Sequence, residues 1–147
     1  MKLKLVLCVS LVCMSLLLLA CGANPDEVTV EATYDDFMEV QDTISRVVTK
    51  DIEVPVGSSF TVTLWSNQTT GFKWTESATI KDSDIILQTD HTFVPPEDSG
   101  LAGAAGKEVW TFKALKKGTS DISMKYSQPW EGGEKDAFSF FLFVTVK

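Results

Sequence analysis

Few side chains in this chain could act together as a nucleophile and its base. The 147 residues include one histidine, His91, and three cysteines, of which Cys8 and Cys13 lie in the apolar first twenty residues. A hydroxyl or thiol nucleophile depends on a neighbouring base, and the sequence has no GxSxG turn to expose a serine. His91 stands in TDHTFVPP, where we expect a surface or turn residue. These residue types argue against acyl-transfer catalysis.

Carboxylate pairs are the other candidate chemistry, because two carboxylates can hydrolyse a glycosidic bond. The pairs Asp35/Asp36 and Asp82/Asp84 lie where we expect a tether and a turn, and they lack the ligand spacing of an EF-hand. We therefore expect solvated side chains, no bound metal and no cofactor. The sequence favours a binding protein over an enzyme, with a glycosidase as a remote alternative.

The amino-terminal segment MKLKLVLCVSLVCMSLLLLAC combines Lys2 and Lys4 with an apolar run over residues 5–20. This pattern predicts a signal peptide over residues 1–20, since the run is too short for a spanning helix. Its last four residues, LLAC, resemble a bacterial lipobox. That resemblance implies cleavage before Cys21 and acylation of its sulfur and amino group, which would hold the protein on a membrane surface outside the cytoplasm. The alternative is a plain secretory signal that leaves Cys21 as a free thiol.

Removal of the signal would leave a domain without thiols beyond Cys21, which excludes disulfides and zinc-thiolate sites. The formal charge of −7 becomes −9 when Lys2 and Lys4 leave. Nucleic acid and anionic lipid headgroups are poor partners for such a charge. Gly22 stands where an aspartate is associated with inner-membrane retention, so we expect an outer-membrane anchor if the organism is Gram-negative.

Residues 22–42 carry seven acidic side chains, and no lysine or arginine occurs between them and Arg46. This charge predicts a solvated, lipidated tether over residues 21–45 that lifts a domain at 46–147 off the bilayer. A short helix near residues 37–40, or an early edge strand, is the alternative.

Beyond the tether the apolar residues recur with a period of two, as in SFTVTLWS, where Phe60, Val62 and Leu64 share one face. About seven short strands separated by turn residues predict an all-β, immunoglobulin-like antiparallel sandwich. The strand-like runs cover residues 46–54, 59–66, 72–76, 84–89, 107–115, 119–126 and 137–146. The last run is apolar on both faces, which predicts a central strand sheltered on both sides, or else one whose outer face meets a partner.

Three stretches between these strands differ from ordinary turns. They are NQTTGF at 67–72, GAAG at 103–106 and QPW at 128–130. Each joins small or backbone-rich residues to a nearby large aromatic. Glycines let a backbone approach another chain closely, and an exposed tryptophan beside proline offers a large contact area with little entropy to lose.

In this order the three stretches resemble the loops of the chagasin-like cysteine protease inhibitors, which carry Asn-Pro-Thr-Thr-Gly-Phe/Tyr, Gly-x-Gly-Gly and Arg-Pro-Trp/Phe. The resemblance covers about residues 46–147. It implies a reversible, non-covalent inhibitor that inserts the three loops into the cleft of a papain-like protease without being cleaved. Thr69 and Thr70 would approach the catalytic cysteine of the enzyme. The expected protease-binding residues are Asn67, Gln68, Thr69, Thr70, Gly71, Phe72, Gly103, Ala104, Ala105, Gly106, Gln128, Pro129 and Trp130.

The three loops depart from the family pattern at one residue each. Gln68 replaces the proline, which could weaken binding by about 0.4–1 kcal/mol. Ala105 replaces a glycine, which would cost roughly 1–2 kcal/mol if its φ had to be positive. Gln128 replaces the arginine and loses an ion pair or a stacking contact.

Two classes of function remain open from the sequence. We expect a monomeric inhibitor whose partner is a papain-like protease, with no nucleic acid and no small-molecule substrate. The alternative is a structural or adhesive β-sandwich of the cell envelope that uses the three loops only as turns.

Overall fold

The structure is a computed structural model that describes residues 27–39, 46–97 and 103–147. The predicted signal peptide and Cys21 lie outside the described residues. Within these described ranges, no helix is long and apolar enough to cross a membrane.

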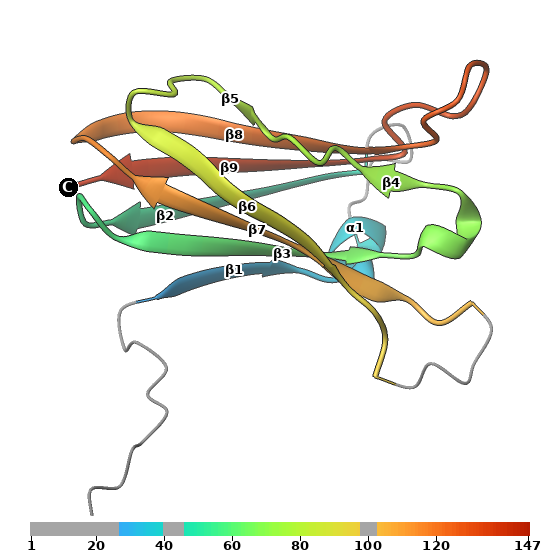
Figure 1. Ribbon diagram of the computed structural model, residues 1–147. Coiled ribbons are helices and arrows are strands. Elements are labelled where there is room, and N and C mark those ends of the chain that lie inside the picture. Colours follow the sequence, from blue (N-terminus) through green and yellow to red (C-terminus); the bar gives the residue numbers. More distant parts are fainter. Residues whose placement is uncertain (1–26, 40–45, 98–102) are drawn as a thin grey trace, which may run out of the picture.

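Two β-sheets face each other in a sandwich (Figure 1). One sheet has four strands in the order β1-β3-β7-β6, and the other has the order β2-β9-β8-β4, with β5 also pairing with β8. The first sheet consists of β1 (Val28–Ala32), β3 (Ser59–Ser66), β6 (Ile86–Val94) and β7 (Gly106–Ala114). The second consists of β2 (Val47–Val54), β4 (Lys73–Trp74), β5 (Thr79–Ile80), β8 (Gly118–Ser127) and β9 (Phe138–Val146). The prediction of an all-β sandwich is confirmed.

The core lies between the sheets and follows the predicted alternation. Phe60, Val62 and Leu64 of β3 are fully buried. The rings of Phe60 and Phe112 stack at 5.3 Å, and Trp74 meets Trp110 edge-on at 6.5 Å. Burial of such large rings is the main favourable contribution to folding.

The strand pairing is not purely antiparallel, which corrects the prediction. β1 pairs parallel to β3, and β2 pairs parallel to β9. Parallel neighbours cannot be joined by a hairpin turn, and both pairs join strands that are distant in sequence. The described chain also forms nine strands instead of about seven, because β1 and the two-residue β5 add to the predicted set.

Residues 28–38 belong to the sandwich and not to a solvated tether. Val30 and Ala32 of β1 are buried, and β1 leads into helix α1 (Tyr34–Met38). Phe37 of α1 is 0% exposed and packs against Trp74 and Phe138. An early edge strand and a short helix therefore both occur here, although the helix begins three residues before the expected 37–40. The acidic side chains point outward while the apolar ones fill the open edge of the core.

Thr33 and Asp36 start helix α1 with a reciprocal capping box. The Thr33 backbone N–H and hydroxyl donate to Asp36 Oδ2 at 2.6 and 2.8 Å. These two hydrogen bonds, with a weaker contribution from Lys50, hold the pKa of Asp36 below its usual value. The cap fixes the turn that brings Phe37 into the core.

Strand β9 is central, as predicted, between β2 and β8. The expectation that both its faces are sheltered is wrong for the described chain, because Phe143 on the outer face is 44% exposed. No described element covers that face of the five-stranded sheet. Except for Val47, the outer side chains of the flanking strands are polar, with Asp51 and Asp121 on either side of Phe143.

Candidate functional site

Three connections meet at one end of the sandwich, opposite the carboxyl terminus (Figure 1). The first loop (residues 67–72) joins β3 to β4, the second loop (103–106) leads into β7, and the third loop (128–130) follows β8. Because β3 and β7 are antiparallel neighbours, the end of one and the start of the other lie side by side, with Ser66 opposite Gly106. The fold thus brings together the three stretches that the sequence singled out.

The first loop holds its own shape through hydrogen bonds. Residues Gln68–Thr70 form a single 3-10 turn, η1, which Asn67 caps. Asn67 Oδ1 accepts from the Thr69 N–H at 3.2 Å and from the Thr69 hydroxyl at 2.6 Å. The Thr70 hydroxyl donates to Asn67 O at 2.6 Å. These bonds restrict the loop where Gln68 replaces the family's proline.

Buried aromatic residues fasten both ends of the first loop to the core. The Tyr126 hydroxyl accepts from the Asn67 N–H at 3.0 Å and donates to Asn67 O at 3.1 Å. Trp74 Nε1 donates to Trp65 O at 2.8 Å, and Phe72 stacks on Tyr126 at 5.4 Å. The loop ends are therefore rigid, while Gln68, Thr69 and Thr70 are exposed to solvent.

A side-chain hydrogen bond ties the first loop to the second. Asn67 Nδ2 donates to Gly103 O at 3.0 Å. Gly106 has no room for a side chain, because a Cβ there would lie 2.4 Å from Val94 O. Asp136 is the one described non-glycine residue with a positive φ, so Ala105 replaces the family's glycine without left-handed strain. The free-energy cost that a positive φ at Ala105 would carry therefore does not apply.

The third loop rests against the first through Trp130. A Cβ on Gly71 would lie only 2.6 Å from Cη2 of Trp130, so the indole packs directly on this glycine. Gly71 has a φ of +82°, the left-handed conformation that glycine tolerates best. Trp130 is still 49% exposed, so it can meet a partner.

Lys135 and Gln128 brace the hairpin that carries Trp130. Lys135 Nζ donates to Trp130 O at 2.9 Å and to Gln128 O. Gln128 Oε1 accepts from the Glu134 N–H at 3.0 Å. Gln128, which replaces the family's arginine, is thus used within the hairpin. Sequence reasoning missed Lys135, and no pattern marks a contact that depends on the folded hairpin.

A buried polar network lies under the first and second loops. Glu108 is 2% exposed, and its Oε1 accepts from the Ser66 hydroxyl at 2.7 Å. Its Oε2 lies 2.9 Å from His91 Nε2, and the His91 ring packs on Trp110 at 4.8 Å. The expectation that His91 is a surface or turn residue is wrong, because β6 continues to Val94 and the inward-facing His91 side chain is only 19% exposed. Glu108 lies on the same face of its strand as Trp110 and Phe112, which point inward. This alternation was the sequence feature that could have predicted the network.

This network does not form a catalytic triad. A nucleophile must bond directly to its base, whereas here the carboxylate stands between the serine and the histidine. Ser66 is also fully buried. The carboxylate pairs are equally unsuited: Asp82 accepts from the Asp84 N–H in a tight turn, and Asp36 caps α1. Among the described residues, no group of three histidine, cysteine or acidic side chains could hold a metal ion.

A β-sandwich that gathers three braced loops at one end is the architecture of a loop-presenting domain. The sequence pattern of the Chagasin family peptidase inhibitor I42 matches residues 53–143. The chain belongs to this family, whose members are inhibitors and not enzymes.

Individual relatives agree with this assignment. The chain is 32% identical to chagasin of Trypanosoma cruzi over 95 residues, which cover 63% of this chain and 86% of that protein. It is 29% identical to amoebiasin-2 of Entamoeba histolytica over 86 residues, covering 58% of this chain and 68% of that protein.

Solved structures show the same fold at lower identity. The cysteine protease inhibitor EhICP2 of Entamoeba histolytica superposes with a TM-score of 0.61 at 22% identity, covering 84% of this chain and 99% of that one. PbICP-C, solved in complex with falcipain-2, gives a TM-score of 0.59 at 17% identity, covering 80% of this chain and 99% of that one.

Proposed function

We propose that the chain is a reversible, non-covalent inhibitor of papain-like cysteine proteases that places its first, second and third loops in the active-site cleft. The observation that carries this proposal is that the three loops contact one another. Asn67 of the first loop binds Gly103 of the second, and Gly71 of the first packs on Trp130 of the third. Membership of the inhibitor family and the likeness to a solved cysteine protease inhibitor support it.

In this proposal each loop has a separate task. The exposed residues Thr69 and Thr70 enter the cleft at the catalytic cysteine, while the second loop lies along one wall as backbone and Trp130 packs on the other. Cleavage needs a peptide bond in near-attack geometry. The 3-10 turn at Gln68–Thr70 is held in another conformation by the side chains of Asn67 and Thr70. The loop can therefore occupy the cleft and remain intact.

Titration of the full-length chain, purified in detergent, against papain tests the proposal directly. We expect inhibition that is reversed on dilution, with the inhibitor recovered uncleaved. Absence of inhibition at micromolar concentration across several papain-like proteases would contradict the proposal.

Trp130→Ala is expected to raise the inhibition constant at least 5-fold, which corresponds to about 1 kcal/mol for an interface aromatic. The control is Phe143→Ala, which removes an aromatic of similar exposure, 44% against 49%, from the open sheet face. We expect the control to change inhibition less than about 2-fold, as for a residue outside an interface. An unchanged inhibition constant for Trp130→Ala would remove this residue from the site.

We also propose that the chain is exported and anchored by lipid on Cys21. Because β1 runs parallel to β3, whose carboxyl end leads into the first loop, β1 begins at the end opposite the three loops. The chain between Cys21 and Val28 spans at most about 25 Å when fully extended. An anchor at Cys21 would thus leave the inhibitory loops on the side that faces away from the bilayer.

Partition of the protein between detergent and water tests the anchor. The wild-type chain, produced in a bacterial host, is expected to enter the detergent phase of Triton X-114 and to carry acyl chains by mass spectrometry. Cys21→Ser is expected to abolish the lipid, because the acceptor thiol is lost. A wild-type protein that stays in water without added mass would contradict the anchor.

A further inference from the structure

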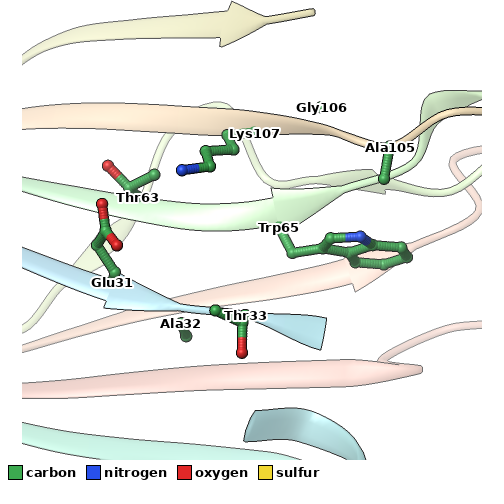
Figure 2. A pocket seen from close by; sticks show the side chains of 8 residues that line it. All are labelled: Glu31, Ala32, Thr33, Thr63, Trp65, Ala105, Gly106 and Lys107. Atoms are coloured by element: carbon green, nitrogen blue, oxygen red, sulfur yellow. The ribbon is translucent and has the colours of Figure 1, made fainter. Parts of the chain in front are cut away.

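A hollow of about 150 Å³ lies on the outer face of the four-stranded sheet, directly beside the second loop (Figure 2). We name it the edge hollow. Its walls come from β1, β3 and the start of β7. The lining used below consists of Glu31, Thr33, Thr63, Trp65, Ala105 and Lys107.

The Trp65 indole forms the apolar part of the edge hollow. It turns toward Ala105, whereas Glu31, Thr63 and Lys107 gather at the other end (Figure 2). Trp65 is half-buried because it also packs on Tyr34, with the ring centroids 4.8 Å apart. This packing holds the indole in place before any partner arrives. The hollow is therefore preformed, which lowers the entropy cost of binding.

The size of the edge hollow restricts what can enter it. Pockets for drug-sized ligands measure about 300–1,000 Å³, and this hollow of about 150 Å³ is smaller. Its lining is largely apolar, with charges of opposite sign at the rim from Glu31 and Lys107. Within the described residues, neither charge takes part in an ion pair. These features suit one apolar side chain from a polar protein surface.

The second loop links the edge hollow to the inhibitory surface. Ala105 and Gly106 belong to both, so a protein wall that covers the second loop must also face the hollow. The opposite wall is supplied by Glu31 and Thr33 of the amino-terminal segment, which lie outside the matched family residues 53–143. The hollow is thus continuous with the proposed interface and extends it beyond the three loops.

We propose that the edge hollow is a fourth contact surface, which receives a single apolar side chain from the rim of the protease's active-site cleft. This inference rests on the proposed function, because it names a further part of the same complex. It assigns a binding role to the packing of β1 against β3. Trp65 then packs on Tyr126 and Phe138 of the core and meets the partner through its exposed edge.

Thr63→Phe tests the edge hollow by filling it. Thr63 is half-buried on the outer face of β3, between the inward-pointing Val62 and Leu64. The full-length variant, titrated against papain in detergent, is expected to inhibit at least 10-fold more weakly than the wild type. The matched control is Thr111→Phe, the same change on the same face of β7 but outside the hollow, which is expected to stay within 2-fold.

A second variant separates loss of binding from loss of folding. Glu31→Trp fills the edge hollow from the exposed rim of β1 and leaves the core unchanged. It should weaken inhibition at least 10-fold while its thermal midpoint stays at the wild-type value. If the folded filling variants inhibit as tightly as the wild type, the edge hollow is not a contact surface, although the inhibitor proposal stands. A wild-type chain that inhibits no papain-like protease overturns both.

Discussion

Replacing Gly71 with alanine is expected to weaken protease inhibition about 30-fold or more, which corresponds to roughly 2 kcal/mol. Gly71 has a φ of +82°, where a Cβ costs about 1–2 kcal/mol. The same Cβ would lie 2.6 Å from the Trp130 ring, so the indole must move. The substitution thus disturbs the first loop and the third loop together. Inhibition constants measured against papain check the effect.

Gly57→Ala is the matched control for this prediction. Gly57 has nearly the same backbone conformation, with a φ of +83°, but a Cβ there meets nothing within 4 Å. Its N–H donates to Ala114 O in the turn before β3, at the end of the sandwich away from the loops. The control should lose stability through backbone strain yet inhibit like the wild type. Equal inhibition by Gly71→Ala and Gly57→Ala would show that the contact with Trp130 does not shape the site.

Most of the sandwich could be predicted from the sequence because alternation records which side chain faces the core. The predicted run at residues 59–66 coincides with β3. The run at 107–115 differs from β7 by one residue at each end, and the run at 137–146 differs from β9 by one residue at its start. Alternation does not record which strand lies next to which. The parallel pairs β1–β3 and β2–β9 join residues far apart in the chain, so they could not be predicted.

The amino-terminal segment shows how charge can hide an element. In VTVEATYDDFM the acidic residues suggested a solvated chain, yet Val30, Ala32 and Phe37 are buried. Their spacing changes from two residues to five where strand β1 gives way to helix α1, so neither period lasts long enough to be recognised. Their burial depends on the open core edge that β3, β4 and β9 create.

The positions of the three loops could be predicted from the sequence, whereas the hydrogen bonds that hold the loops together could not. Motif order located Asn67, Gly71 and Trp130, and the fold brings all three to one end. The bonds from Asn67 to Gly103 and to Tyr126 span 36 and 59 residues and exist only in the folded chain. Local hydrogen bonds hold the first loop around Gln68, and Gln128 accepts a hydrogen bond within its own hairpin, which the residue types alone do not reveal.

Glu108→Ala is expected to lower the free energy of unfolding by about 3 kcal/mol. The carboxylate is 2% exposed and serves both the Ser66 hydroxyl and His91 Nε2. Alanine would leave these two polar groups without their partner and create a cavity between β3, β6 and β7. Removal of one member of a buried polar network costs more than the bonds contributed, because the remaining groups stay desolvated. Urea unfolding followed by tryptophan fluorescence measures the change.

Glu53→Ala provides the same substitution at an exposed position. Glu53 pairs with Lys147, but both side chains are more than 60% exposed, so this pair is expected to contribute less than about 1 kcal/mol. Glu108→Gln is expected to lie between the two, since an amide keeps the shape and can still accept from Ser66. Equal stabilities for Glu108→Ala and Glu53→Ala would mean that the buried carboxylate is not a structural anchor. A difference of the expected size would instead show that the buried acid anchors β3 and β6 to β7 through Ser66 and His91. The first and second loops extend from the ends of β3 and β7, so the same anchor supports both loops.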